Sequence, residues 1–167
     1  MYGNTGTLGA EIYLSSYDSD PATITVSYSN VQGGPARVYV ETGSTLNWKK
    51  NNINTDPLFV DPSGDDLHLK SLAGRYCPET GLWVIDDVTS PCIDAGNPSG
   101  PIGLEPFANG GYVNMGAYGA TAEASKTYFG TEPCEVIVAG DINGDCMIDM
   151  VDLSFLASNW LVDNTSK

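Results

Sequence analysis

The chain has 167 residues, which is enough for one domain with a small appendage. Its 21 acidic residues outnumber its 7 basic residues, and the formal charge of −14 excludes nucleic acid and anionic membranes as partners. No apolar run approaches the roughly 18 residues that a membrane span needs. The residues after Met1 have neither the basic nor the apolar region of a secretion signal, so the chain is either cytosolic or the tail of a longer protein. We favour the second, because the four cysteines are more typical of disulfides than of metal ligands.

Residues 1–70 contain short segments in which apolar and polar side chains alternate, as they do in half-buried strands. The clearest segment is 23–29, where Ile24, Val26 and Tyr28 share one face. His68 lies between two leucines in the last segment, and the alternation predicts an exposed side chain. Strands are expected at residues 11–14, 23–29, 37–40, 58–60 and 66–70. Their spacing is compatible with a sandwich or with the coils of a parallel β-helix.

Several longer segments favour the second fold. They are Asn-Val-Gln-Gly-Gly at 30–34, Asp-Pro-Leu-Phe-Val-Asp-Pro at 56–62, Ser-Pro-Cys-Ile-Asp-Ala-Gly at 90–96 and Asn-Met-Gly-Ala-Tyr-Gly at 114–119. Over residues 20–130 the series resembles the end of right-handed parallel β-helix repeat proteins, the pectate-lyase-like family that includes the choice-of-anchor Q group. The resemblance implies a mainly β chain from a secreted or surface-attached protein associated with polysaccharides.

On this interpretation residues 1–70 are the final coils and residues 71–132 are a C-terminal cap. Each coil covers the apolar face of its neighbour, so the last coil needs a cover. Glycine and proline are frequent in residues 71–132, and the apolar residues available to close the end are Trp83, Ile93, Phe107, Val113 and Tyr118.

The four cysteines are predicted to form disulfides rather than to bind a metal. No Cys-x-x-Cys occurs, and the single histidine has no partner ligand. We expect the pairs Cys77–Cys92 and Cys134–Cys146, each closing a short loop and contributing about 3 kcal/mol. Four cysteines allow three connectivities, and free thiols in a reducing compartment are the alternative.

No catalytic residues are predicted. Acidic pairs occur at 65–66 and 86–87, but neighbours on a strand point to opposite faces, so solvated surface acids are the expectation. Asn-Thr-Asp at 54–56 resembles one motif of the β-helix polygalacturonases, whose other motifs do not follow. Arg37 and Arg75 lack the acid cluster of a β-helix lyase. The aromatic residues Tyr13, Tyr39 and Trp48 are assigned to the core or surface rather than to sugar binding.

The last part of the chain carries a pattern typical of a calcium loop. Positions 1, 3, 5, 7 and 12 of such a loop correspond to side-chain oxygens of Asp141, Asn143 and Asp145, the backbone carbonyl of Met147 and the carboxylate of Asp152. Ile148 takes position 8, where an apolar side chain lies under the metal. Apolar residues then recur at helical spacing, at Leu153, Leu156, Ala157, Trp160 and Leu161.

These residues resemble the dockerin calcium repeat, in which aspartate closes the loop. The resemblance predicts an EF-hand-like loop and helix in a module over residues 133–167, with Ca²⁺ as its cofactor. Two features differ from the usual pattern. Cys146 stands at position 6, where a glycine allows the sharp turn, and one repeat is present where cohesin-binding dockerins have two.

Three functional interpretations follow from the sequence. The first is a non-catalytic C-terminal region of an extracellular or cell-surface β-helix protein linked to polysaccharide binding or breakdown. Its calcium module would attach it to a polysaccharide, a cohesin-like protein or a cell-envelope protein. The second is part of a polysaccharide lyase or glycoside hydrolase whose catalytic coils lie upstream. The third is a structural calcium-binding surface repeat without a carbohydrate partner.

Overall fold

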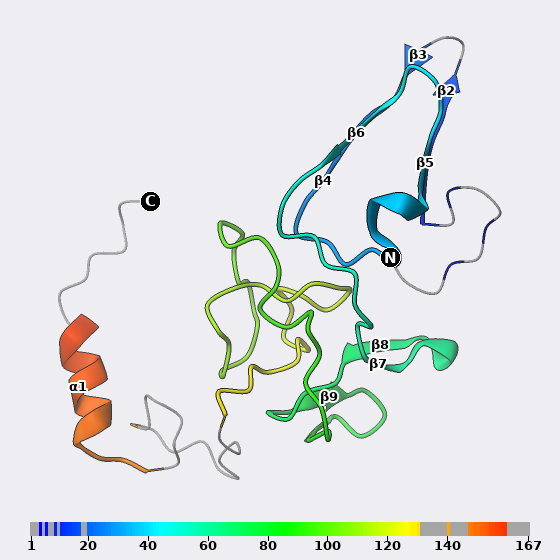
Figure 1. The fold of residues 1–167 in the computed structure, drawn as a ribbon. Helices are drawn as coiled ribbons and strands as arrows, with labels where there is room; N and C mark the ends of the chain where they lie inside the picture. The colour runs from blue at the N-terminus through cyan, green and yellow to red at the C-terminus, as the bar shows by residue number, and fades with distance from the viewer. Residues whose placement is uncertain are drawn as a thin grey trace. The chain divides into compact units, whose positions relative to one another are not determined.

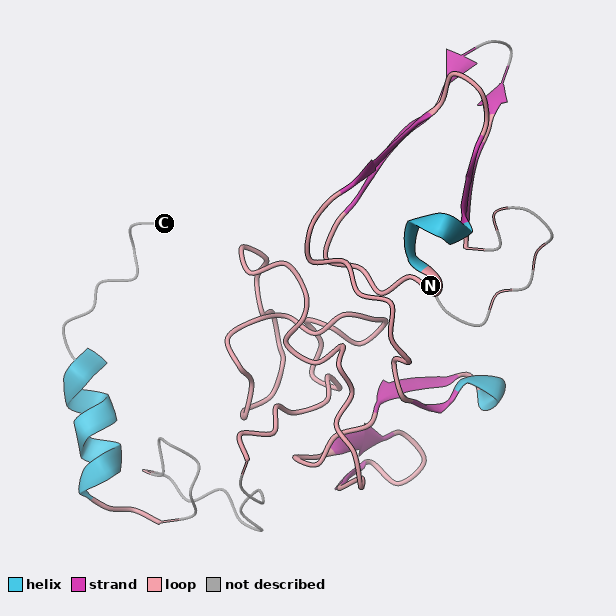
Figure 2. Ribbon diagram, in the orientation of Figure 1, coloured by secondary structure: helices cyan, strands magenta, loops and turns pink. Residues whose placement is uncertain are grey.

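The computed structural model describes residues 4, 6, 9, 11–17, 20–130, 140 and 147–159. The chain divides into two compact units, Met1–Thr127 and Tyr128–Lys167. The first unit contains short strands joined by loops and turns, and the second contains an α-helix (Figure 1, Figure 2). No helix in the described ranges is long and apolar enough to cross a membrane.

Two parallel strand pairs join residues 12–26 to residues 38–48. β1 (Ile12–Leu14) pairs with β5 (Val38–Val40), and β4 (Thr23–Val26) pairs with β6 (Thr45–Trp48). Val38 follows its partner Ile12 by 26 positions, and Thr45 follows its partner Thr23 by 22. We call residues 12–34 the first layer and residues 38–55 the second layer. The paired paths of the two layers are visible where β4 runs beside β6 in Figure 1.

Backbone hydrogen bonds continue between the layers beyond the strand ends. Amide groups of the second layer donate to carbonyl groups of the first: Thr45 to Ala22 at 2.8 Å, Lys49 to Val26 at 2.9 Å and Ile53 to Ser29 at 3.0 Å. Asn30 and Ile53 form a further parallel bridge. The register is therefore kept around the bend that follows β4.

Three asparagine side chains supply hydrogen bonds at this bend, and we call Asn30, Asn52 and Asn54 the cross-layer asparagines. Asn52 donates from Nδ2 to the Val26 carbonyl at 2.9 Å, and its Oδ1 accepts from the Ser29 amide at 3.0 Å. Asn30 Nδ2 donates to the Thr55 carbonyl at 2.9 Å, and its Oδ1 accepts from the Thr55 amide at 3.3 Å. Asn54 Oδ1 accepts from the Gly33 amide at 2.6 Å.

The alternation of side chains along the strands produces the first core cluster. Ile12 and Leu14 of β1 are buried while Tyr13 between them is exposed, as a period of two requires. Val26 and Val31 complete the buried set. The partly buried residues packed against this set are Ala22, Ile24, Val38, Leu46 and Trp48.

Antiparallel pairs follow the two layers. β7 (Phe59–Asp61) and β8 (Asp66–Leu69) form a hairpin around the 3₁₀ turn η2 (Pro62–Gly64). Asp61 caps this turn, because its carboxylate accepts from the amides of Ser63 and Gly64. β9 (Arg75–Cys77) and β10 (Leu82–Val84) form a second hairpin. The remaining short elements are β2 (Ser16–Tyr17), β3 (Asp20–Pro21) and the 3₁₀ turn η1 (Gly34–Arg37).

Residues 85–130 are described without strand or helix, and polar side chains hold their loops. Glu105 is 8% exposed, and its Oε1 accepts from the amides of Asn114 and Ala120, both at 2.8 Å. The Asn114 side chain joins the Asp94 amide to the Ser125 carbonyl at 2.8 and 2.7 Å. These bonds replace a backbone ladder, because irregular buried loops must pair their polar groups in some other way.

The sequence-based expectations for the elements are largely confirmed. The chain is mainly β, and a strand occurs within or overlapping every segment where one was predicted. β4 ends at Val26, however, and Tyr28 lies beyond it with φ of 47°. The described strands form parallel and antiparallel pairs that do not close into a β-helix. In the second unit, α1 (Met150–Asn159) confirms that a helix follows the predicted loop, and Trp160 and Leu161 lie outside the described residues.

We expect Val31→Ala to destabilise the first unit by about 2–3 kcal/mol. Val31 is 0% exposed, and the substitution removes two buried methyl groups and leaves a cavity between the layers. Denaturant unfolding followed by far-UV circular dichroism measures the loss. Val40→Ala is the matched control, because Val40 is 36% exposed and should lose under about 1 kcal/mol. Equal losses in the two variants would contradict this packing.

Candidate functional site

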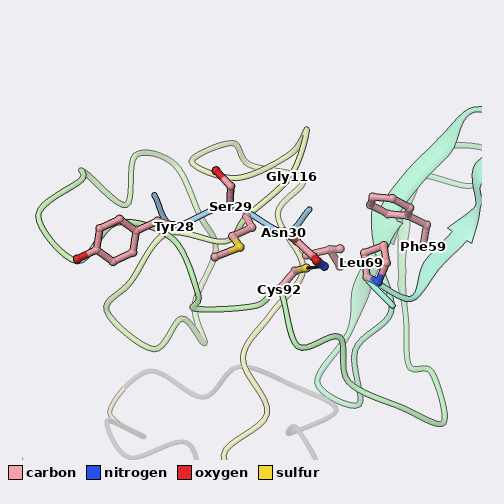
Figure 3. A pocket seen from close by; sticks show the side chains of 9 residues that line it. Tyr28, Ser29, Asn30, Phe59, Leu69, Cys92 and Gly116 are labelled. Carbon is pink, nitrogen blue, oxygen red and sulfur yellow. Dashed lines mark hydrogen bonds between the residues drawn. The ribbon is translucent and has the colours of Figure 1, made fainter. Parts of the chain in front are cut away.

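A cavity of about 210 Å³ opens beside the bend that follows β4 (Figure 3). Three parts of the first unit contribute to it: residues 28–30 of the first layer, the β7–β8 hairpin with the residue pair before it, and the loops of residues 92–116. The lining residues are Tyr28, Ser29, Asn30, Pro57, Phe59, Leu69, Cys92, Met115 and Gly116. Leu69, Cys92 and Met115 also form the second core cluster, so the floor of the cavity is apolar.

Two unusual backbone conformations shape this cavity. Tyr28 has φ of 47° and Leu58, between two lining residues, has φ of 54°. Such values cost a residue with a side chain about 1–3 kcal/mol and persist where surrounding contacts enforce them. Here the Leu58 amide donates to Asp56 Oδ1 at 2.9 Å, and the Pro57 carbonyl accepts from the buried Ser90 hydroxyl at 2.6 Å.

The chemistry of the lining suits an uncharged occupant. None of the nine lining residues is acidic or basic. The Asn30 amide group is already occupied, since Nδ2 donates to the Thr55 carbonyl and to Cys92 Sγ at 3.1 Å, the latter bond drawn in Figure 3. The cavity therefore offers van der Waals contact and a few polar groups but no carboxylate, imidazole, ammonium or guanidinium group.

The prediction of a Cys77–Cys92 disulfide is wrong. Both thiols are free. Cys92 is 2% exposed and belongs to the second core cluster, where it contacts the Asn30 amide, whereas Cys77 ends β9. Hydrogen bonds with Thr80 lower the pKa of the Cys77 thiol. Cys134 and Cys146 lie outside the described residues.

The acidic pairs contribute to the structure rather than standing free in solvent. Asp86 Oδ1 accepts from Arg75 Nε at 3.0 Å, and its Oδ2 accepts from the Ser71 amide at 2.9 Å. Asp66 Oδ1 lies 2.6 Å from His68 Nδ1. Asp65 and Asp87 are exposed, so each pair has one carboxylate engaged in the fold and one in solvent. The strand alternation invoked for these pairs does not apply, because Asp65 follows η2 and residues 86–87 follow β10.

The prediction that His68 is exposed is wrong. The side chain is 0% exposed, and its ring stacks on Tyr118 with centroids 3.6 Å apart. The alternation correctly placed Asp66 and His68 on one face of β8, but residues 118–123 cover that face. The Asp-x-His spacing at 66–68 was the signal that these two side chains meet.

Two of the five predicted calcium ligands lie in described residues. Asp152 is 3% exposed, and its Oδ2 accepts from the Asp149 amide at 2.8 Å. Asp149 Oδ1 in turn accepts from the Val151 amide at 2.7 Å. Asp149 thus caps the first turn of α1 through the Val151 amide, while the Asp152 carboxylate turns back to the Asp149 amide, as one half of a capping box does. Met147 precedes this start and is exposed.

The other predicted ligands, Asp141, Asn143 and Asp145, lie outside the described residues. The described residues hold no group of three or more His, Cys, Asp or Glu side chains placed for a metal ion. Gly140, which precedes the predicted loop, lies beside the side chain of Ile148, since a Cβ at Gly140 would be 3.6 Å from it. Ile148 itself is 59% exposed. The calcium site therefore stays a prediction from the sequence.

A pair of tyrosines on β1 and β5 forms an outward-facing aromatic stack. The Tyr13 and Tyr39 rings lie 4.9 Å apart between centroids, and Tyr13 is 49% exposed. The Tyr13 hydroxyl donates to Glu41 Oε1 at 2.6 Å, and the Ser16 amide donates to Glu41 Oε2 at 2.7 Å. These two hydrogen bonds lower the pKa of the Glu41 carboxyl, and the bond from the Tyr13 hydroxyl has the larger effect. The same bond raises the pKa of the Tyr13 hydroxyl.

We expect Tyr13→Phe to raise the pKa of Glu41 toward the ordinary glutamate value, since the largest cause of its depression is removed. A carboxyl with a depressed pKa contributes stability above its unfolded pKa and loses it as pH falls through the folded pKa. The variant should therefore be less stable than the parent chain at neutral pH, with the difference shrinking in acid. Carbon-detected NMR titration of the carboxyl measures the shift. Tyr39→Phe keeps the ring stack and the Tyr13 hydroxyl, so an equal rise in that control would refute the assignment.

The chain was then compared with known proteins. Residues 25–96 match the model of a family described as Disaggregatase related. Domains of this kind are associated with parallel β-helix repeat proteins and occur in surface proteins. The matched segment contains the cross-layer asparagines and seven of the nine residues that line the cavity. Comparison with curated proteins and with solved structures gave no match.

Proposed function

We propose that the segment at residues 25–96, a disaggregatase-related domain, belongs to the final coils of a parallel β-helix in a larger surface protein. The observation that carries this proposal is the parallel register of the two layers. Partners 22 and 26 positions apart are what successive coils of about 20–25 residues require. Residues 85–130, with their side-chain hydrogen bonds, serve as the cap.

We assign this chain a non-catalytic role in the parent protein. Asp66 and Asp86 are engaged in pairs within the fold, and the lining of the cavity contains no Asp, Glu, His, Lys or Arg. The Glu41 carboxylate lies beside the aromatic stack of Tyr13 and Tyr39, but its two oxygens accept hydrogen bonds from the Tyr13 hydroxyl and the Ser16 amide. A scaffold that carries an attachment module accounts for these features.

The attachment module is the loop and helix of residues 140–159 with a bound calcium ion. Asp141, Asn143, Asp145 and Asp152 would supply side-chain oxygens, and Met147 would supply its carbonyl. When bound, the ion neutralises acids that otherwise repel one another within a short loop. The hydrogen bond from the Asp149 amide to the Asp152 carboxylate supports this role, since it turns that carboxylate back past the start of α1. Extracellular calcium near 1 mM would saturate a site whose dissociation constant is about 10⁻⁴–10⁻³ M.

We expect calcium to raise the melting temperature of the C-terminal unit, and we expect Asp141→Ala and Asp152→Asn to abolish that rise. Each substitution removes one carboxylate from the donor set, while asparagine at 152 keeps an oxygen acceptor for the Asp149 amide. Differential scanning calorimetry in millimolar calcium and in chelator measures the difference for each protein. Asp87→Ala, an exposed acid of the first unit, should leave the rise intact. An undiminished rise in the two loop variants would place the ion elsewhere.

The proposed partner of the parent protein is a polysaccharide, and the strong negative charge favours an uncharged one. We expect the calcium-loaded chain to be retained by neutral polysaccharides on a glycan array and to release no reducing ends from them. Release of products, or of unsaturated products from acidic polymers, would instead support a lyase or hydrolase. Absence of binding to any glycan would leave the attachment role to a cohesin-like or cell-envelope protein and would contradict the polysaccharide assignment.

A further inference from the structure

His68 is buried between two parts of the first unit that are far apart in sequence. The ring belongs to β8 and stacks on Tyr118, with an angle of 13° between the ring planes. Its Nδ1 lies 2.6 Å from Asp66 Oδ1, and the Tyr76 ring of β9 lies 6.1 Å away between centroids. The side chain is 0% exposed.

The other ring nitrogen faces a second carboxylate. His68 Nε2 lies 3.6 Å from Glu123 Oε2, and it is buried without a hydrogen-bond partner. The titratable groups that face the ring are therefore Asp66 from β8, Glu123 and Tyr118 from the returning loop, and Tyr76 from β9. Two of these four groups are carboxylates, and none is a cation.

The protonation state of the ring decides whether this arrangement is favourable. A neutral imidazole has one N–H, and the short contact with Asp66 uses it at Nδ1. Nε2 then presents a lone pair toward the Glu123 carboxylate, which leaves a buried acceptor unpaired beside a negative charge. An imidazolium has an N–H at each nitrogen and serves both carboxylates.

We propose that His68 is a proton-dependent clamp, whose imidazolium form joins β8 to the loop at Glu123 and stabilises the capped end of the first unit. Uptake of one proton at Nε2 adds the contact to Glu123, and loss of that proton removes it. Histidine is the side chain that ordinarily changes charge between about pH 5 and 8. The contribution is thus present while the ring holds its second proton and is lost when that proton leaves.

The test uses the fact that the chain has one histidine, so that its imidazole signals need no assignment. The ring of the calcium-loaded full chain is titrated by ¹⁵N NMR, together with Glu123→Gln and the control Glu79→Gln. Glutamine at 123 keeps the size of the side chain, removes its charge and offers an N–H to neutral Nε2. We expect the titration midpoint to move to lower pH in Glu123→Gln and to stay in place in the control, because only the first substitution removes the charge that faces Nε2. An unmoved midpoint in Glu123→Gln, or equal movement in both variants, would overturn the clamp.

A second measurement needs no substitution at the clamp. The melting temperature of the parent chain should fall by a few degrees between pH 5.5 and pH 8, because the stabilising contact to Glu123 is lost when Nε2 releases its proton. Glu79→Gln should show the same fall, and Glu123→Gln should show little or none. A melting temperature that rises or stays level across this range in the parent chain would also overturn the proposal.

Discussion

Successive layers of the first unit stay in register because asparagine side chains hydrogen-bond across them where the chain bends. Strands keep register through backbone pairs, but a bend turns amides and carbonyls away from their partners. Asn30 and Asn52 each join one layer to the other through both ends of the amide group, and Asn54 accepts from a first-layer amide. A satisfied bond of this kind adds only about 1 kcal/mol, whereas a buried polar group left unpaired costs more. The bends therefore hold the layers together as firmly as the strands do.

The cavity and the cap depend on this register. Residues 28–30 line the cavity because the bend holds them above Leu69, Cys92 and Met115, and the strained Tyr28 backbone is part of the same bend. Beyond the hairpins, Glu105 and Asn114 give the loops of residues 85–130 the same kind of polar support. Most acids near these elements are engaged in hydrogen bonds, which agrees better with a scaffold than with a catalytic centre.

The elements with local signals were predictable from sequence, and the contacts between distant segments were not. Alternation located β1, β4 and β8, because burying one face of a strand imposes a period of two. The same alternation could not show that residues 118–123 return over His68. Cysteine spacing suggested a bridge that the fold does not make, since Cys92 points into the second core cluster. The cross-layer hydrogen bonds of Asn30 and Asn52 were not identified from the sequence. Their separation along the sequence, about the length of one layer, was a usable signal. The ligand prediction at Asp141, Asn143 and Asp145 rests on spacing alone.

The central claim is the parallel register of the two layers, and NMR of the isotopically labelled chain tests it most directly. The account predicts slow amide exchange at Val31, Thr45, Lys49 and Ile53, together with interstrand NOEs that place Ile24 beside Leu46 and Ile12 beside Val38. Fast exchange at these amides, or NOEs that pair β4 with β6 in the antiparallel sense, would contradict it and would remove the basis for a coil of a β-helix.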